Sequence, residues 1–244
     1  MLNNWLIGIG LNTGLGAIAL LLPKKVLTTA GIIHAWGLGI LVWGCLGWQG
    51  YLVILFYLVA GSGVTRIGKE VKEAKGIAEK RDGARGPENL WGSAFTAAIC
   101  AIGYGIFPNP LWQLGYVASL TTKLADTTAS EVGKAYGRTT YLITTLQSVP
   151  NGTEGAISLE GTIAGIIGAA CQALVGYGLG LINSPVDLGI CIFAAFIATN
   201  IESLIGAIWQ SQYEWLTNEV VNGIMGAIGA IVAVLLAIAL IFLS

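Results

Sequence analysis

A polar decapeptide between two long apolar stretches carries the residue types best suited to chemistry. It reads Ala125-Asp126-Thr127-Thr128-Ala129-Ser130-Glu131-Val132-Gly133-Lys134. If this segment is helical, Asp126, Ser130 and Lys134 recur at every fourth residue and share one face. That face offers a carboxylate, a hydroxyl and an ammonium group, which suit a nucleotide and its magnesium ion. Glu131 lies on another face of such a helix, so a metal site shared with Asp126 requires a break in the helix. A solvated helix end without chemistry is the alternative.

A turn-forming segment, 150–155, precedes a later apolar span. Its residues Asn151, Gly152 and Thr153 are typical of a turn with exposed backbone amides. Glu160 follows near the expected amino terminus of the next helix, where anions bind favourably. This segment is therefore a candidate anion site.

A carboxylate also stands inside an apolar span, in the segment Asn200-Ile201-Glu202-Ser203. Burying a carboxylate in a membrane costs about 3 kcal/mol on insertion scales. We therefore expect Glu202 to face a partner, water or a metal ion rather than lipid.

The polar segment 66–89 changes character halfway along. Its first half alternates acidic and basic residues at helical spacing, which is typical of a solvated helix. Its second half contains Gly and Pro together with Arg81 and Arg85, and this favours a loop that brings cations and backbone amides to phosphates. A plain connecting loop is the alternative interpretation.

The composition indicates that these segments belong to a membrane protein. Of 244 residues, 55% are hydrophobic and only 10% are charged, which excludes an ordinary soluble domain. A membrane-spanning helix needs roughly 20 apolar residues, and about eight stretches qualify. We place them at residues 5–22, 26–46, 51–65, 90–106, 111–125, 156–182, 186–208 and 220–243. The third, fourth and fifth are short, so one could be re-entrant. We predict one integral membrane domain, 1–244, built as an all-α bundle of transmembrane helices.

The basic residues predict the orientation of this bundle. If the amino terminus lies outside, all 12 Lys and Arg residues fall in or beside cytoplasmic segments. The main cytoplasmic segments are then about 66–89, 126–155 and 209–219, and the active site lies at that face. We expect the protein in the cell inner membrane or an equivalent membrane. The near balance of 12 basic and 13 acidic residues gives no sign of nucleic-acid binding.

Three motifs together resemble the phytyl-phosphate kinase family of polytopic membrane proteins. They are the Ala-Asp-Thr-x-Ala-Ser-Glu-x-Gly-Lys run at 125–134, the Pro-x-Gly-Thr-x-Gly-Ala-x-Ser run at 150–158 and Asn-x-Glu-Ser at 200–203. The first two are more distantly similar to motifs of CDP-diacylglycerol synthase and of the dolichol and phytol kinases. The resemblance implies transfer of a γ-phosphoryl group from a nucleoside triphosphate, CTP in particular, to a prenyl monophosphate lipid such as phytyl phosphate. The prenyl diphosphate would then serve tocopherol and phylloquinone synthesis.

The residues can be assigned roles in such a reaction. We assign catalysis to Asp126, Lys134, Arg81 and Arg85, and Mg²⁺ binding to Asp126, Glu131, Glu160 and Glu202. Nucleotide binding is assigned to Ser130, Asn151, Gly152, Thr153, Arg138 and Asn89. An acceptor phosphate is already ionised, so no strong general base is needed, and the enzyme must chiefly hold two anions together.

Two other functions remain open at this point. The same scaffold would give a CTP-dependent cytidylyltransferase of a lipid phosphate if the attack fell on the α-phosphorus. A transporter of isoprenoids or small metabolites could use Glu202 and His34 along a path, but it would need polar groups at both faces. The sequence leaves the oligomeric state open, and a homo-oligomer is compatible with it.

Overall fold

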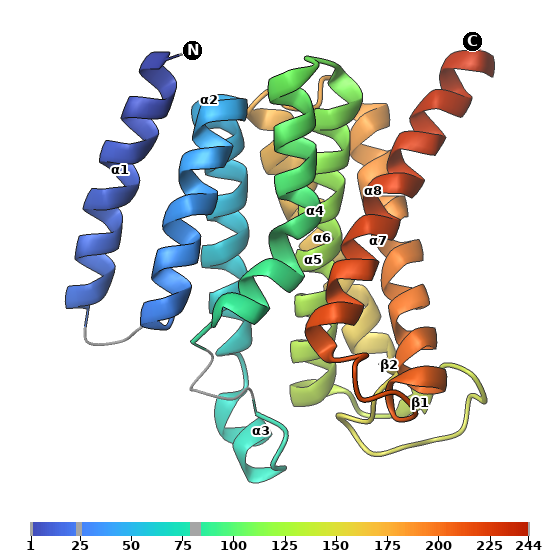
Figure 1. The fold of residues 1–244 in the computed structure, drawn as a ribbon. Coiled ribbons are helices and arrows are strands. Elements are labelled where there is room, and N and C mark those ends of the chain that lie inside the picture. Colours follow the sequence, from blue (N-terminus) through green and yellow to red (C-terminus); the bar gives the residue numbers. More distant parts are fainter. Residues whose placement is uncertain (1, 23–25, 79–83, 244) are drawn as a thin grey trace.

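The computed structural model describes residues 2–22, 26–78 and 84–243 as a helical bundle (Figure 1). Its helices are α1 (Leu2–Leu21), α2 (Thr29–Thr65), α3 (Lys69–Ala74), α4 (Pro87–Ile106), α5 (Pro110–Tyr136), α6 (Leu159–Gly178), α7 (Pro185–Ile205) and α8 (Asn218–Leu243). A π-helical turn, Gly206–Gln210, extends α7. The strands β1 (Thr140–Leu142) and β2 (Ala156–Ser158) form an antiparallel pair between α5 and α6. The prediction of an all-α membrane bundle is confirmed.

Helix α2 consists of two legs that run in opposite directions. Gly47 separates them with φ 69° and ψ −163°, a conformation open almost only to glycine. Gly31 near the start of the first leg and Gly61 near the end of the second both lie against Arg85, so the chain must reverse between them. The legs correspond to the predicted spans 26–46 and 51–65.

Within the described residues, each of the eight predicted spans corresponds to a helix or to one leg of α2. The predicted span 156–182 is too long, because Ala156–Ser158 form β2 and α6 covers only Leu159–Gly178. Five helices, α1, α2, α6, α7 and α8, are long and apolar enough to cross a membrane. Helices α4 and α5 lie beside them in the bundle and contain more polar residues (Figure 1).

Helix α5 occupies the centre of the bundle, where it packs against α2, α4, α6, α7 and α8. Glycines of α6 permit the close approach of that helix. A Cβ atom at Gly161 would lie 2.7 Å from the carbonyl oxygen of Ala129, and one at Gly168 would lie 2.5 Å from the Thr128 hydroxyl. Small residues therefore let the two backbones approach without a gap. Helix α1, in contrast, lies at the edge of the bundle and packs mainly on α2 (Figure 1).

The polar segments gather at one end of the bundle, away from both chain termini (Figure 1). This end, called the polar end below, contains α3, the β1–β2 pair and the loop before α8. Proline and asparagine begin α5 at the opposite end, where the Asn109 side chain accepts a hydrogen bond from the Leu111 amide. The expected convergence of the polar segments is thus seen. Assignment of the polar end to the cytoplasm stays a prediction from the distribution of Lys and Arg.

We expect Gly47→Ala to lower the free energy of unfolding by about 1–3 kcal/mol, because alanine strains the backbone at the reversal of α2. The new Cβ would meet only the flexible end of Gln49, so the cost is conformational rather than steric. Thermal unfolding in detergent would measure it. Gly37→Ala is the matched control, since Gly37 is helical and its Cβ would meet nothing. Equal stability of the two variants would contradict the assignment of strain to Gly47.

Candidate functional site

A buried lysine and a carboxylate form the centre of the polar chemistry. Lys123 of α5 is 3% exposed. Its Nζ lies 2.7 Å from Oδ2 of Asp126, one turn further along the same helix. The same Nζ donates a hydrogen bond of 2.9 Å to Oδ1 of Asn222 on α8. A buried ammonium group is costly unless it is paired in this way.

A second carboxylate approaches this pair from α7. Glu202 interacts electrostatically with both Asp126 and Lys123, and the Ser203 hydroxyl lies 3.4 Å from its Oε2 atom. Two of the four carboxylates that the sequence assigned to a metal ion are thus neighbours. Lys123 supplies the positive charge that holds them together.

Arg85 extends the same group of charges toward α2. Its Nη1 donates a hydrogen bond of 2.6 Å to the Tyr57 hydroxyl, and its guanidinium carbon lies 5.1 Å from the centre of the Tyr57 ring. Tyr57 in turn interacts electrostatically with Lys123. Two backbone hydrogen bonds fix Arg85 beside the start of α2, from its amide to the Val26 carbonyl and from the Thr28 amide to its own carbonyl. We call Tyr57, Arg85, Lys123, Asp126, Glu202 and Asn222 the central cluster.

Glu131 belongs to a different group of charges. It forms a buried ion pair with Lys72 of α3, and Nζ of Lys134 lies 3.7 Å from its other carboxylate oxygen. Lys72 also donates to the Thr65 carbonyl at 2.7 Å. Because α5 is continuous through both positions, Asp126 and Glu131 point to different sides of the helix. In this structure the two carboxylates are therefore not brought together, and a metal site shared by them stays a prediction.

The predicted set of four metal-binding carboxylates is not assembled. Within the described ranges no three His, Cys, Asp or Glu side chains are grouped so that they could hold one metal ion. Glu160 lies in the first turn of α6, and the set separates because Glu131 pairs with lysines while Asp126 and Glu202 join the central cluster. Two carboxylates are still sufficient for Mg²⁺ when substrate phosphates complete its coordination.

The predicted nucleotide-binding turn has a structural role in this conformation. The Asn151 side-chain amide faces three carbonyl groups at the end of α5, the nearest being Gly137 at 3.0 Å, and its Oδ1 accepts from Thr140. The Thr153 hydroxyl donates to the Pro150 carbonyl. Gly152 has φ 88°, and a Cβ there would meet Ile77. These contacts occupy the side-chain donors of Asn151 and Thr153.

The remaining predicted residues have varied surroundings. Asn89 accepts from the Gly86 amide and donates to Glu219, so it caps α4 and joins it to α8. Ser130 and Arg138 are exposed at the polar end, and Lys134 is partly exposed there. Arg81 lies outside the described residues. His34 accepts a hydrogen bond from Trp91 and lines neither of the cavities described next.

A cavity of about 230 Å³ adjoins the central cluster. It lies between α1, both legs of α2 and the start of α4, and its walls are almost entirely apolar. Arg85 and Tyr57 line it together with Ser93. We call this cavity the apolar chamber.

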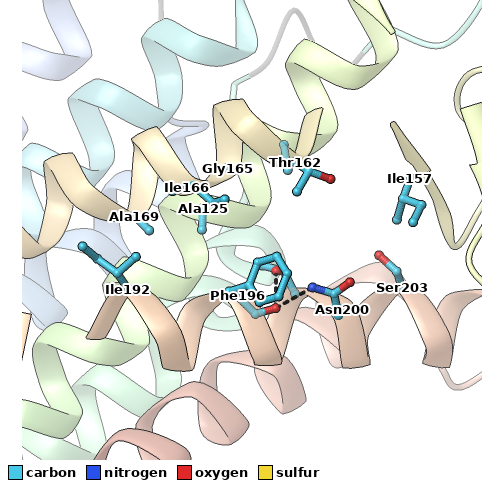
Figure 2. Close-up of a pocket in the computed structure, with 12 residues that line it drawn as sticks. Ala125, Ile157, Thr162, Gly165, Ile166, Ala169, Ile192, Phe196, Asn200 and Ser203 are labelled. Carbon is cyan, nitrogen blue, oxygen red and sulfur yellow. Dashed lines mark hydrogen bonds between the residues drawn. The ribbon is translucent and has the colours of Figure 1, made fainter. Parts of the chain in front are cut away.

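A smaller cleft of about 60 Å³ lies between α5, α6 and α7. Figure 2 shows Thr162 of α6 on one side and Asn200 and Ser203 of α7 on the other. The amide of Asn200 donates to the Phe196 carbonyl within α7. This cleft is much smaller than ordinary ligand pockets of 300–1,000 Å³, so it suits only a small polar group.

Sequence reasoning missed Lys123, Tyr57, Lys72 and Asn222. A signal for Lys123 was present, because a lysine within an apolar span is costly and indicates a buried partner. Tyr57 and Asn222 carried no comparable signal, since their roles depend on contacts between distant helices.

We expect Lys72→Met to lower the free energy of unfolding by about 3–5 kcal/mol, because buried Glu131 would lose the lysine that lies closer to it than Lys134 does. The double variant Lys72→Met/Glu131→Leu should recover much of this loss, since it leaves no uncompensated charge. Denaturation of the two single variants and the double variant, analysed as a cycle, would measure the coupling. Additive losses would mean that the pair does not stabilise the fold.

Comparisons with known proteins agree with this architecture. Residues 12–230 match the family described as integral membrane protein DUF92. The chain is 59% identical to an uncharacterized membrane protein of Synechocystis sp. over 94% of its own length and 90% of the relative. It is 45% identical to Protein VTE6, chloroplastic, of Arabidopsis thaliana over 86% of its length, and spans 65% of that protein. An uncharacterized membrane protein of Methanocaldococcus jannaschii is 32% identical over 90% of each chain. No solved structure matches. The chain belongs to the integral membrane protein family DUF92.

Proposed function

We propose that this protein transfers the γ-phosphoryl group of a nucleoside triphosphate, CTP in particular, to a prenyl monophosphate such as phytyl phosphate. The observation that carries the proposal is the central cluster, in which Arg85 and Lys123 lie with Asp126 and Glu202 beside an apolar chamber. An anionic lipid needs such a combination of cations and apolar walls. The likeness to the chloroplast protein and the three motifs support the proposal.

The proposed reaction is a displacement at phosphorus. An oxygen of the prenyl phosphate attacks the γ-phosphorus, the bond from that phosphorus to the β–γ bridging oxygen breaks, and the nucleoside diphosphate leaves with the electron pair. The attacking oxygen is already ionised, so the protein needs mainly to position the two anions and reduce their repulsion. We assign that task to Arg85 and Lys123. Both cations are held by neighbours, so little reorganisation is needed when the phosphates bind.

Magnesium and the nucleotide are parts of the same proposal. Asp126 and Glu202 would hold Mg²⁺, which commonly uses one or two carboxylates together with substrate phosphates and would neutralise phosphate charge. Ser130, Lys134 and Arg138 would bind the nucleotide at the partly exposed end of α5. Lys123 orients the Asp126 carboxylate, because its ammonium group contacts one of the two carboxylate oxygens.

We expect Asp126→Asn to reduce turnover at least about 100-fold, because the amide removes negative charge needed beside the cations and the metal. The variant should also unfold at a lower temperature, because buried Lys123 loses its charged partner, so turnover is compared below that temperature. Asp187→Asn is the matched control, because Asp187 lies in the first turn of α7 at the opposite end of that helix from Glu202. Turnover in detergent and thermal unfolding would be measured for both. Wild-type turnover by Asp126→Asn would remove this carboxylate from the mechanism.

Product analysis would test the reaction itself. The purified protein would be incubated with phytyl monophosphate, Mg²⁺ and each nucleoside triphosphate in turn, and the products identified by mass spectrometry. We expect a prenyl diphosphate and a nucleoside diphosphate, with CTP the best donor. A nucleotide-linked lipid with released pyrophosphate would identify a cytidylyltransferase instead. No consumption of nucleotide with any prenyl phosphate would overturn the proposal.

A further inference from the structure

The polar residues that line the apolar chamber lie mainly at its two ends. At one end Arg85 and Tyr57 belong to the central cluster. The outermost lining residues at the other end are Asn12 on α1, Gly39 on the first leg of α2 and Tyr51 on the second. Aliphatic and aromatic side chains, with a few small residues, line the space between them.

The Arg85 end is suited to an anion. Among the described residues, no carboxylate forms an ion pair with Arg85, and its side chain donates a hydrogen bond to the hydroxyl of Tyr57. The guanidinium group can donate several further hydrogen bonds, and a phosphate is a fitting acceptor. An amphiphile whose charged head lies here would have its apolar part in the chamber.

The opposite end is closed by a hydrogen-bonded pair. The Tyr51 hydroxyl donates to Oδ1 of Asn12 at 2.9 Å, and the Asn12 amide nitrogen donates to the Gly8 carbonyl at 2.8 Å. Both side chains are buried. The first leg of α2 passes directly against them, because a Cβ at Gly39 would lie 2.0 Å from Oδ1 of Asn12. Moving this pair would break buried hydrogen bonds, so it resists a longer ligand.

The two ends are separated by a fixed length of helix. Gly31 of α2 lies beside the Arg85 backbone and Gly39 lies beside Asn12, which corresponds to roughly 12 Å along the helix axis. The chamber therefore has a defined depth as well as a defined polarity. An extended phytyl chain is longer than this distance, so the chain would have to bend within the chamber.

We propose that the apolar chamber holds the hydrocarbon chain of the isoprenoid phosphate with its head group at Arg85, and that the Asn12–Tyr51 pair limits the chain length accepted. This inference rests on the proposed function for the class of substrate. It adds the location of the chain and the residues that select its length.

Gly16→Leu tests the location by filling the chamber halfway along. Gly16 lines the chamber, and its Cβ would meet only Ile32 at 3.7 Å, so a leucine fits the backbone and projects into the space. Gly14→Leu is the matched control on the same helix, because Gly14 is exposed and its Cβ would meet nothing. Geranyl, farnesyl and phytyl monophosphates are the probes. Their binding is followed by thermal stabilisation of the protein in detergent, and turnover is measured in parallel.

We expect Gly16→Leu to weaken binding of the phytyl compound at least about tenfold relative to the geranyl compound, whereas Gly14→Leu keeps the wild-type order. Asn12→Ala should change the preference in the opposite direction, toward longer chains, because it removes the closed end. The same length preference in wild type, Gly16→Leu and Gly14→Leu would overturn the chamber assignment even if phosphoryl transfer is observed. The expected length preferences in binding without any phosphoryl transfer would instead overturn the proposed function and leave the chamber assignment standing.

Discussion

The ion pair between Lys123 and Asp126 is the interaction on which the rest of the structure depends. Charged groups within an apolar bundle are tolerated only when they are paired and hydrogen-bonded. Helix α5 carries both partners and must therefore lie at the centre, where α7 and α8 can supply Glu202 and Asn222. The glycine-rich face of α6 then allows the close packing that keeps this region enclosed. The helices thus enclose the charged Lys123–Asp126 pair, so that neither group is exposed to lipid.

The sequence was sufficient to predict the helices, because each requires a long apolar run and ends at local signals such as proline, glycine or asparagine. It also identified Asp126 and Glu202, since carboxylates next to apolar spans are conspicuous by their cost. The two legs of α2 were expected as separate spans, and Gly47 explains why the chain can reverse between them within a few residues.

The partners of the charged residues could not be predicted in the same way. The pairing of Glu131 with Lys72 joins positions 59 residues apart, and the contact of Arg85 with Tyr57 crosses between two helices. Such contacts depend on how helices pack, which no local pattern encodes. Asn151 is a further example. Its turn-forming context predicts a binding loop, but in the structure its amide faces the carbonyl groups of Gly133 and Gly137 at the end of α5.

The peripheral position of α1 has a consequence for how lipid would enter and leave. This helix forms one wall of the apolar chamber but packs mainly on α2, and most of its side chains are exposed at the outer surface of the bundle. Of the helices that line the chamber, α1 therefore makes the fewest contacts with the rest of the bundle, and these are the contacts that would break if it moved. Sideways displacement of α1 would connect the chamber with the surrounding bilayer, so a hydrophobic molecule could exchange within the membrane plane without passing through water.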